Sequence, residues 1–226
     1  MAELAVVIGA GGGIGAALAD ALEVQGRQVL RLGRATTPAL DLLDEPSIAA
    51  AAAHAATLGP PALVIDATGF LHGPGIAPEK TWRELDPAAL AHAFALNAIG
   101  PALLMKHFLP LLPRSGPAVF ATLSARVGSI TDNRLGGWYA YRASKAALNQ
   151  LVRTAAIELR RRAPQAICVA LHPGTVDTKL SAPFARTGLE VRPPAQAATD
   201  LLAVIAGLTP ADSGGFLDHK ALPIPW

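Results

Sequence analysis

Cysteine, aromatic residues and charged residues are all scarce in this chain. Its 226 residues include one cysteine, Cys168, so no disulfide can form within the chain and no zinc or iron–sulfur spacing exists. Charged residues make up 16% and the net charge is +2. The one basic cluster, Arg160-Arg161-Arg162, stands at a helix end, where it is expected to complement the helix dipole rather than to bind nucleic acid. Hydrophobic residues make up 51%, which excludes an intrinsically disordered chain. We expect a globular protein that holds no metal and binds no nucleic acid.

Long hydrophobic runs are also missing. The apolar run at residues 4–8 is too short to span a membrane, and no positively charged segment precedes it as in a signal peptide. Polar residues and prolines interrupt the alanine-rich runs. We therefore expect a cytoplasmic protein with no membrane partner, and the length suits a single domain over residues 1–226.

Apolar strand patterns alternate with helical patterns along the whole chain. Strands are expected at residues 4–8, 28–32, 62–66, 118–123, 165–171 and 215–217, and helices at 46–58, 87–112, 138–163 and 195–206, with another after the glycine-rich stretch 9–15. This order is typical of an α/β fold. It predicts a doubly wound parallel sheet of about seven strands with helices on both faces.

The glycine-rich stretch joins the first strand to the first helix. Its spacing is G-x-x-x-G-x-G, formed by Gly9, Gly13 and Gly15, with Ile14 between the last two. Glycine lets the backbone approach a pyrophosphate, and the following helix N-terminus supplies free N–H groups and a positive dipole. The stretch therefore indicates the phosphate-binding element of a Rossmann fold that binds NAD(P). A P-loop is excluded because no Gly-Lys-Ser/Thr follows.

Two charged residues follow the second strand, at the place where folds of this type bind the adenosine ribose of the cofactor. Arg34 offers a partner for a 2′-phosphate, and no acid stands at position 33 or 34 to hold a 2′-hydroxyl. This favours NADP(H) over NAD(H), with a solvated loop arginine as the alternative; Arg31 lies three residues earlier and is a second candidate. Asp41 either contacts the adenine ring of the cofactor or serves as a turn or capping residue.

Tyr141 and Lys145 stand four residues apart in a helical pattern. Residues at that spacing share one helix face, about 5–6 Å apart, and a nearby cation favours ionisation of the phenol. Tyr141 then becomes a proton donor or acceptor near neutral pH. Such pairs also occur by chance on surface helices, and Tyr139 competes but has no lysine four residues on. Asn97, amid apolar neighbours, either satisfies a buried backbone group or holds a water.

Six motifs in order resemble the short-chain dehydrogenase/reductase family over essentially the whole chain. They are GAGGGIG (9–15), DATG (66–69), Asn97 with the following Gly-Pro, a serine at a strand end, YRASK (141–145) and HPGTVDT (172–178). The stretches Ser-Ala-Arg-Val-Gly-Ser-Ile and Asp-Asn-Arg-Leu-Gly-Gly-Trp-Tyr and the terminal Leu-Pro-Ile-Pro-Trp look most like its C-factor/sniffer-like carbonyl reductase branch.

The resemblance implies a role for each motif. Tyr141 would donate the proton to a carbonyl, Lys145 would lower the pKa of Tyr141 and hold the nicotinamide ribose, and Ser124 would orient the carbonyl. Asn97 would hold a water of the proton relay. The cofactor-binding positions implied at the strand ends are Ala67, Gly69, Pro173, Gly174, Val176 and Thr178, with Asn97, Tyr141 and Lys145 also touching the cofactor.

Three departures from the family pattern accompany the resemblance. Ile8 stands where a threonine is usual, and residues 66–67 read Asp-Ala where two asparagines are common. The family serine often stands three residues before a glycine, a position that Ala125 holds here. Ser124 is therefore one position early, and Ser129 is a second candidate.

Two functions follow as expectations. The first is NADPH-dependent reduction of an aldehyde, ketone or quinone to an alcohol. The second is a signalling or interaction protein of the same fold that binds NADP(H) with little turnover. A substrate lid is expected near residues 179–192, and a homodimer or homotetramer built from the helices at 87–112 and 138–163.

Overall fold

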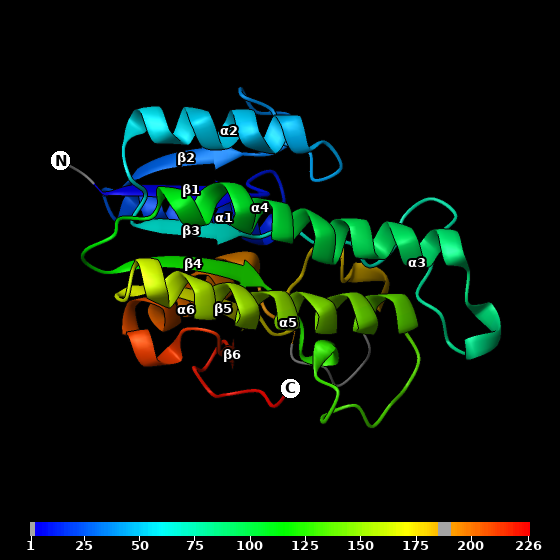
Figure 1. Ribbon diagram of the computed structural model, residues 1–226. Helices are drawn as coiled ribbons and strands as arrows, with labels where there is room; N and C mark the ends of the chain where they lie inside the picture. Colours follow the sequence, from blue (N-terminus) through cyan, green and yellow to red (C-terminus); the bar gives the residue numbers. More distant parts are fainter. Residues whose placement is uncertain (1–2, 185–190) are drawn as a thin grey trace.

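One parallel sheet forms the centre of the structure (Figure 1). The structure, a computed structural model, describes residues 3–184 and 191–226. Its strands lie in the order β2-β1-β3-β4-β5-β6. Their bounds are Leu4–Ile8 for β1, Gln28–Leu32 for β2, Leu63–Asp66 for β3, Ala118–Leu123 for β4, Ala166–His172 for β5 and Phe216–Asp218 for β6. The predicted doubly wound α/β fold is confirmed, although the described residues form six strands rather than about seven.

Helices cover both faces of this sheet. The α-helices are α1 (Gly13–Val24), α2 (Glu45–Leu58), α3 (Pro87–Phe94), α4 (Gly100–Phe108), α5 (Tyr139–Arg162) and α6 (Pro194–Gly207). Shorter turns are η1 (Trp82–Glu84), η2 (Ala95–Ile99), η3 (Leu109–Leu111), η4 (Arg126–Gly128), η5 (Ala182–Phe184) and η6 (Pro210–Asp212). The lid expected near 179–192 includes η5, and its residues 185–190 lie outside the described residues.

Side chains of the strands alternate between two cores, because successive strand residues point to opposite faces. Val6, Val64 and Phe120 lie in the core beneath α2, α4 and α5. Their neighbours Ala5 and Ile65 lie in the core beneath α1 and α6. Both sets are buried, which explains why these strands read as continuous apolar runs in the sequence.

The helix predicted at 87–112 is widened at its centre. α3 begins at Pro87, and the carboxylate of Asp86 accepts hydrogen bonds from the first free N–H groups of the helix. η2 is a π-helical turn that contains Asn97. Such turns within α-helices often occur at functional sites, because the extra residue changes the direction in which a side chain points.

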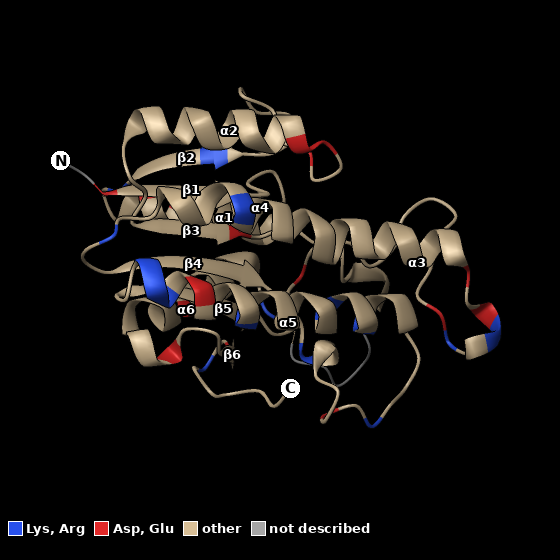
Figure 2. Ribbon diagram, viewed as in Figure 1, with Lys and Arg blue, Asp and Glu red and all other residues tan. Residues whose placement is uncertain are grey.

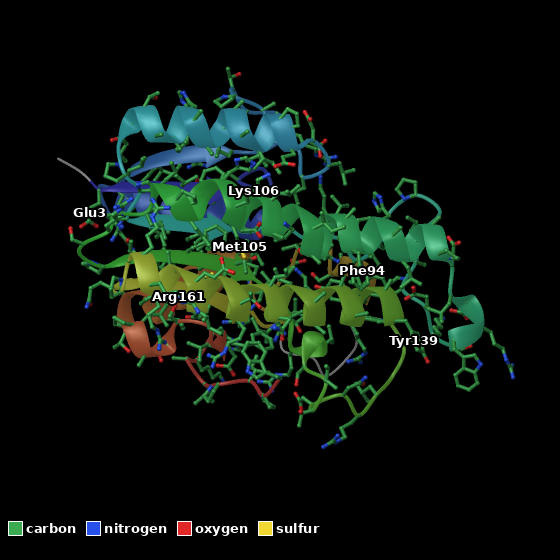
Figure 3. All side chains as sticks on the ribbon, in the orientation of Figure 1. Glu3, Phe94, Met105, Lys106, Tyr139 and Arg161 are labelled. Carbon is green, nitrogen blue, oxygen red and sulfur yellow. The ribbon has the colours of Figure 1, made fainter. Side chains whose placement is uncertain are left out.

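The stretch Pro87–Leu111 is long and apolar enough to cross a membrane by length and composition alone. Its buried side chains include Leu104, Met105 and Phe108, which lie in the core against the sheet. Figure 3 labels Phe94 and Met105 along this run. Packing on the sheet accounts for the buried part of this stretch, which is 39% of its most apolar window.

Figure 2 shows charged positions along α5 as well as at helix ends and in loops, and α4 carries Lys106. The last turn of α5 carries Arg160, Arg161 and Arg162. Positive charge there is favourable beside the negative end of the helix dipole. Figure 3 shows Arg161 near this end of α5 and Tyr139 near the other, and in Figure 1 the helix runs along β4 rather than across the strands.

Candidate active site

The segments that follow β1, β3, β4 and β5 begin side by side at the carboxyl edge of the sheet. Strand pairing places Ile8 beside Asp66 and Asp66 beside Thr122. β5 ends next to them, because Leu123 pairs with Leu171. The glycine-rich turn, the DATG segment, the serine and the HPGTVDT segment therefore meet at one edge, where folds of this type bind ligands.

The glycine-rich turn leaves no room for a side chain at two of its positions. A Cβ built on Gly15 would lie 2.2 Å from the carbonyl oxygen of Gly9, and one on Gly9 would lie 3.1 Å from the carbonyl oxygen of Ala67. A Cβ on Gly13 would lie 2.9 Å from Cγ2 of Thr178, so the segment after β5 lies against the turn. α1 begins at Gly13, and its first N–H groups face the turn. This arrangement suits a phosphate at the helix N-terminus.

Asn97 connects three elements through its side-chain amide. Its Oδ1 accepts from the N–H of Phe70 at 2.7 Å, and its Nδ2 donates to the carbonyl oxygen of Phe70 at 2.7 Å. Nδ2 also donates to Oγ of Ser144 on α5 at 3.1 Å. Of the two alternatives that the sequence left open, the structure has the first: this fully buried amide satisfies backbone groups. Its role in a water relay stays a prediction.

Lys145 reaches the edge of the sheet beneath the segment after β3. Its Nζ donates to the carbonyl oxygen of Leu123 at 2.8 Å. A Cβ built on Gly69 would lie 3.7 Å from this Nζ and 3.9 Å from Oδ1 of Asn97. Three of the predicted residues, Gly69, Asn97 and Lys145, are thus brought together.

Burial controls the protonation of the Tyr–Lys pair. It raises the pKa of Tyr141 to about 12, because the phenolate would lose contact with water. It lowers the pKa of Lys145 to about 8, and the negative charge of Asp66 opposes this second shift. The pKa of Tyr141 therefore moves upward rather than downward as the nearby cation alone predicts. Tyr141 is a protonated phenol at neutral pH, which suits a proton donor.

Asp66 has a role that the sequence reasoning missed. Its carboxylate is buried at 1% exposure. Oδ2 accepts from Oγ1 of Thr122 at 2.7 Å, and Oδ1 accepts from the N–H and Oγ1 of Thr68 at 3.0 and 2.6 Å. The sequence signal was an acid at the end of an apolar strand, a place where a buried charge needs several partners.

The segment after β5 is held by two side chains from outside it. The guanidinium of Arg192 donates to the carbonyl oxygen of Pro173 and pairs with Asp200. A Cβ on Gly174, which has φ +78°, would lie 2.7 Å from Nη2 of Arg192. Oγ of Ser181 donates to the carbonyl oxygen of Val176. Arg192 was not predicted, because it follows the motif by many residues and only the fold brings it back.

These motifs and their geometry agree with one known family. Residues 3–187 match the short chain dehydrogenase family. The chain belongs to the short-chain dehydrogenase family. The predicted family is thereby confirmed, and with it the prediction of an NAD(P)-dependent oxidoreductase.

Several relatives of this short-chain dehydrogenase are known. It is 38% identical over 144 residues to the protein named C-signal of Myxococcus xanthus, an alignment that covers 63% of this chain and 82% of the relative. The crystal structure of an NADPH-bound carbonyl reductase from chicken fatty liver matches with a TM-score of 0.85 at 25% identity, covering 99% and 98% of the two chains. The Sniffer carbonyl reductase of Drosophila melanogaster matches in fold with a TM-score of 0.85 at 22% identity over 100% of both chains.

Ser124 of this short-chain dehydrogenase lies on the same side of β4 as α5, but its hydroxyl is directed along the helix. Its Oγ donates to Oδ1 of Asn149 at 2.7 Å, and the side chain is buried. Asn149 follows Tyr141 by eight residues, about 12 Å along the helix axis. Among the described residues, the hydroxyl of Ser124 thus donates to Asn149, and no hydrogen bond joins it to Tyr141. The second candidate, Ser129, accepts from the N–H of Asp132 at 3.0 Å and serves a turn.

Arg34 and Asp41 lie beyond β2. Arg34 is exposed, in the loop where the adenosine ribose is expected. Arg31, the second candidate for a phosphate contact, instead donates to two carboxylates of α1 at 2.6 to 2.9 Å. Asp41 accepts from the N–H of Leu43 at 2.9 Å, the turn role that the sequence left open. Ile14, next in the glycine turn, packs on the core beneath α1 and α6.

Gly15→Ala tests the close approach within the glycine turn. Alanine normally stabilises a helix more than glycine does, but here its Cβ would lie 2.2 Å from the carbonyl oxygen of Gly9. We expect a loss of about 1–3 kcal/mol in the free energy of unfolding, measured by urea denaturation. Gly11→Ala is the control, since a Cβ there meets nothing within 4 Å. Equal stability of the two variants would contradict the tight turn.

Proposed function

We propose that this enzyme reduces the carbonyl group of an aldehyde, ketone or quinone to an alcohol at the expense of NADPH. The observation that carries the proposal is the pair formed by half-buried Tyr141 and buried Lys145 at the start of α5, beside Gly69 and the amide of Asn97. Tyr141 is protonated at neutral pH because burial raises its pKa to about 12. A protonated phenol is the group that reduction of a carbonyl requires.

The glycine cradle fits a dinucleotide cofactor, because a Cβ at Gly9, Gly13 or Gly15 would meet neighbouring atoms at 3.2 Å or less. When bound, NADPH would supply the hydride. Tyr141 would give its proton to the oxygen that gains negative charge. Lys145, now on the carbonyl oxygen of Leu123, would stabilise the resulting tyrosinate and hold the nicotinamide ribose. Val176 and Thr178 would hold the nicotinamide amide, with Pro173 and Gly174 beside it.

Preference for NADP(H) over NAD(H) rests on Arg34. Its guanidinium is exposed beyond β2, and the neighbouring position is glycine rather than an acid. A guanidinium forms paired hydrogen bonds with a phosphate. The similar carbonyl reductase from chicken, whose structure holds NADPH, supports the same preference.

The enzyme would act in the cytoplasm on a small molecule, as a homodimer or homotetramer. The proposed contact is formed by two helical stretches: residues 87–112, which include α3, η2 and α4, and residues 138–163, which include α5. Ile99 and Ile157 on this side are exposed at 55% and 51%. Apolar exposure of this kind favours association.

A second candidate function is a signalling or interaction protein that binds NADP(H) with little turnover. Similarity to the protein named C-signal favours it, as does the engagement of the Ser124 hydroxyl by Asn149. This candidate predicts tight cofactor binding and a biological effect that survives the loss of Tyr141.

Tyr141→Phe tests the proton donor. We expect kcat for reduction of a carbonyl panel with NADPH to fall by about 100- to 10,000-fold, because the phenolic proton is removed while the ring stays. Tyr139→Phe is the matched control on the same helix, and it should retain turnover. Full turnover by Tyr141→Phe would disprove the mechanism, and absence of turnover in the unmodified enzyme would favour the second candidate.

Arg34→Ala tests the cofactor preference. We expect the dissociation constant for NADPH, measured by fluorescence titration, to rise about 10- to 100-fold, because a charge-assisted contact is lost. The value for NADH should change little. Arg114→Ala, which removes an exposed arginine before β4, is the control. Tighter binding of NADH than NADPH by the unmodified enzyme would count against Arg34.

Ser124→Ala tests the role of the serine, whose assignment to the carbonyl stays a prediction. Because its hydroxyl donates to buried Asn149, we expect the free energy of unfolding to fall by about 1–3 kcal/mol. We expect kcat to change by less than about 10-fold. A loss of about 100-fold in kcat with unchanged stability, the size typical of a lost oxyanion donor, would instead assign Ser124 to the carbonyl.

A further inference from the structure

Trp138, the residue before α5, has a backbone conformation that side chains rarely adopt. Its φ is 53° and its ψ is 44°, in the left-handed region. Gly136 and Gly137 before it have φ of 63° and 66°, so three consecutive residues have positive φ. For a bulky residue it is an outlier that persists only where the surrounding structure enforces it, and such residues cluster at functional sites.

Two charged side chains hold this turn in place. The guanidinium of Arg142 donates to the carbonyl oxygens of Gly137 and Gly136 at 2.9 and 3.1 Å. From the other side, the backbone carbonyl of Glu79 accepts the N–H of Trp138 at 2.5 Å. The Glu79 carboxylate is buried and accepts the N–H of Ala140 at 3.2 Å, in place of a cap from the helix itself. The backbone that carries the indole of Trp138 is therefore held from both ends of the turn.

The fixed indole lies among three other rings at the candidate site. Its centroid lies 6.2 Å from that of Tyr141 and 5.2 Å from that of Phe184, each at an interplanar angle of 67°. His72 continues the row, 5.4 Å from Phe184 at 66°. These spacings are those of edge-to-face aromatic pairs. We call His72, Phe184, Trp138 and Tyr141 the aromatic wall.

The aromatic wall is assembled from three separate segments. His72 comes from the segment after β3, Phe184 from η5, and Trp138 and Tyr141 from the start of α5. Nε2 of His72 lies 3.2 Å from the carbonyl oxygen of Lys179, which ties the first two segments together. All four side chains are only half-buried. A row of partly accessible rings that includes the proton donor offers aromatic edges and faces to a bound molecule.

We infer that Trp138 determines the substrate specificity of this enzyme. Its indole pairs with the aromatic ring of a substrate and so places a carbonyl group attached to that ring beside Tyr141. The inference rests on the proposed reductase function. An aromatic ring conjugated to its carbonyl is planar, and it can pair with the indole at the centroid distance at which Phe184 does. A saturated ring of equal size is puckered and lacks the π-system that favours such pairing.

The test compares benzaldehyde with cyclohexanecarbaldehyde, which have the same carbon framework. The quantity measured is the ratio of their kcat/KM values with NADPH, for the full chain and its variants. Trp138→Leu should lower this ratio by about 3- to 10-fold, the size expected for one lost aromatic pair. Trp138→Phe keeps a ring on the same strained backbone and should stay within about 3-fold of the unmodified ratio.

Trp82→Leu is the matched control, since Trp82 is 68% exposed on η1, and it should leave the ratio unchanged. An unchanged ratio in Trp138→Leu overturns the inference while leaving the reductase function intact. If neither aldehyde is reduced by the unmodified enzyme, the reductase function fails, and the wall is tested by calorimetry with benzamide and cyclohexanecarboxamide. If the unmodified protein binds benzamide more tightly than cyclohexanecarboxamide and Trp138→Leu abolishes this preference, the inference about Trp138 is supported. Equal binding of the two amides by the unmodified protein overturns it.

Discussion

The hydrogen bonds of Asn97 hold the site together. Its amide joins the π-helical turn η2 to the segment after β3 through Phe70 and to α5 through Ser144. Because Asn97 is fully buried, breaking these bonds would leave unsatisfied polar groups in the core. α5 is thereby set against the sheet, and Lys145, the next residue after Ser144, reaches the carbonyl oxygen of Leu123.

Burial then shifts the pKa values of Tyr141 and Lys145 on the helix that Asn97 positions. It raises the pKa of Tyr141 and lowers the pKa of Lys145, since each charged form would be removed from water. The same helix begins without a capping side chain of its own, and Glu79 from the segment after β3 supplies the acceptor. Tyr141, Lys145 and a strained tryptophan are thus presented by one helix end that other segments hold in place.

Much of the fold follows from local patterns. Strands at 4–8, 28–32 and 118–123 lie at the predicted residues. The strands at 4–8 and 118–123 are covered on both faces and are therefore largely apolar, whereas 28–32 is an edge strand that carries Gln28 and Arg31. The helix predicted at 87–112 is instead divided by the turn that carries Asn97. Ser124 shows what the sequence could not predict about the site. Its spacing from the following glycine differs from the family pattern by one residue, but the direction of its hydroxyl depends on Asn149, 25 residues away.

The sequence by itself determined the order of strands and helices, the glycine turn, and the shared helix face of Tyr141 and Lys145. Each depends on spacing between residues close in the chain, which periodicity records. Only the tertiary structure decided that Arg31 pairs with α1 rather than with a ligand, that the pKa of Tyr141 rises, and that Trp138 is fixed beside Tyr141. These depend on burial and on partners distant in sequence, which no local pattern contains.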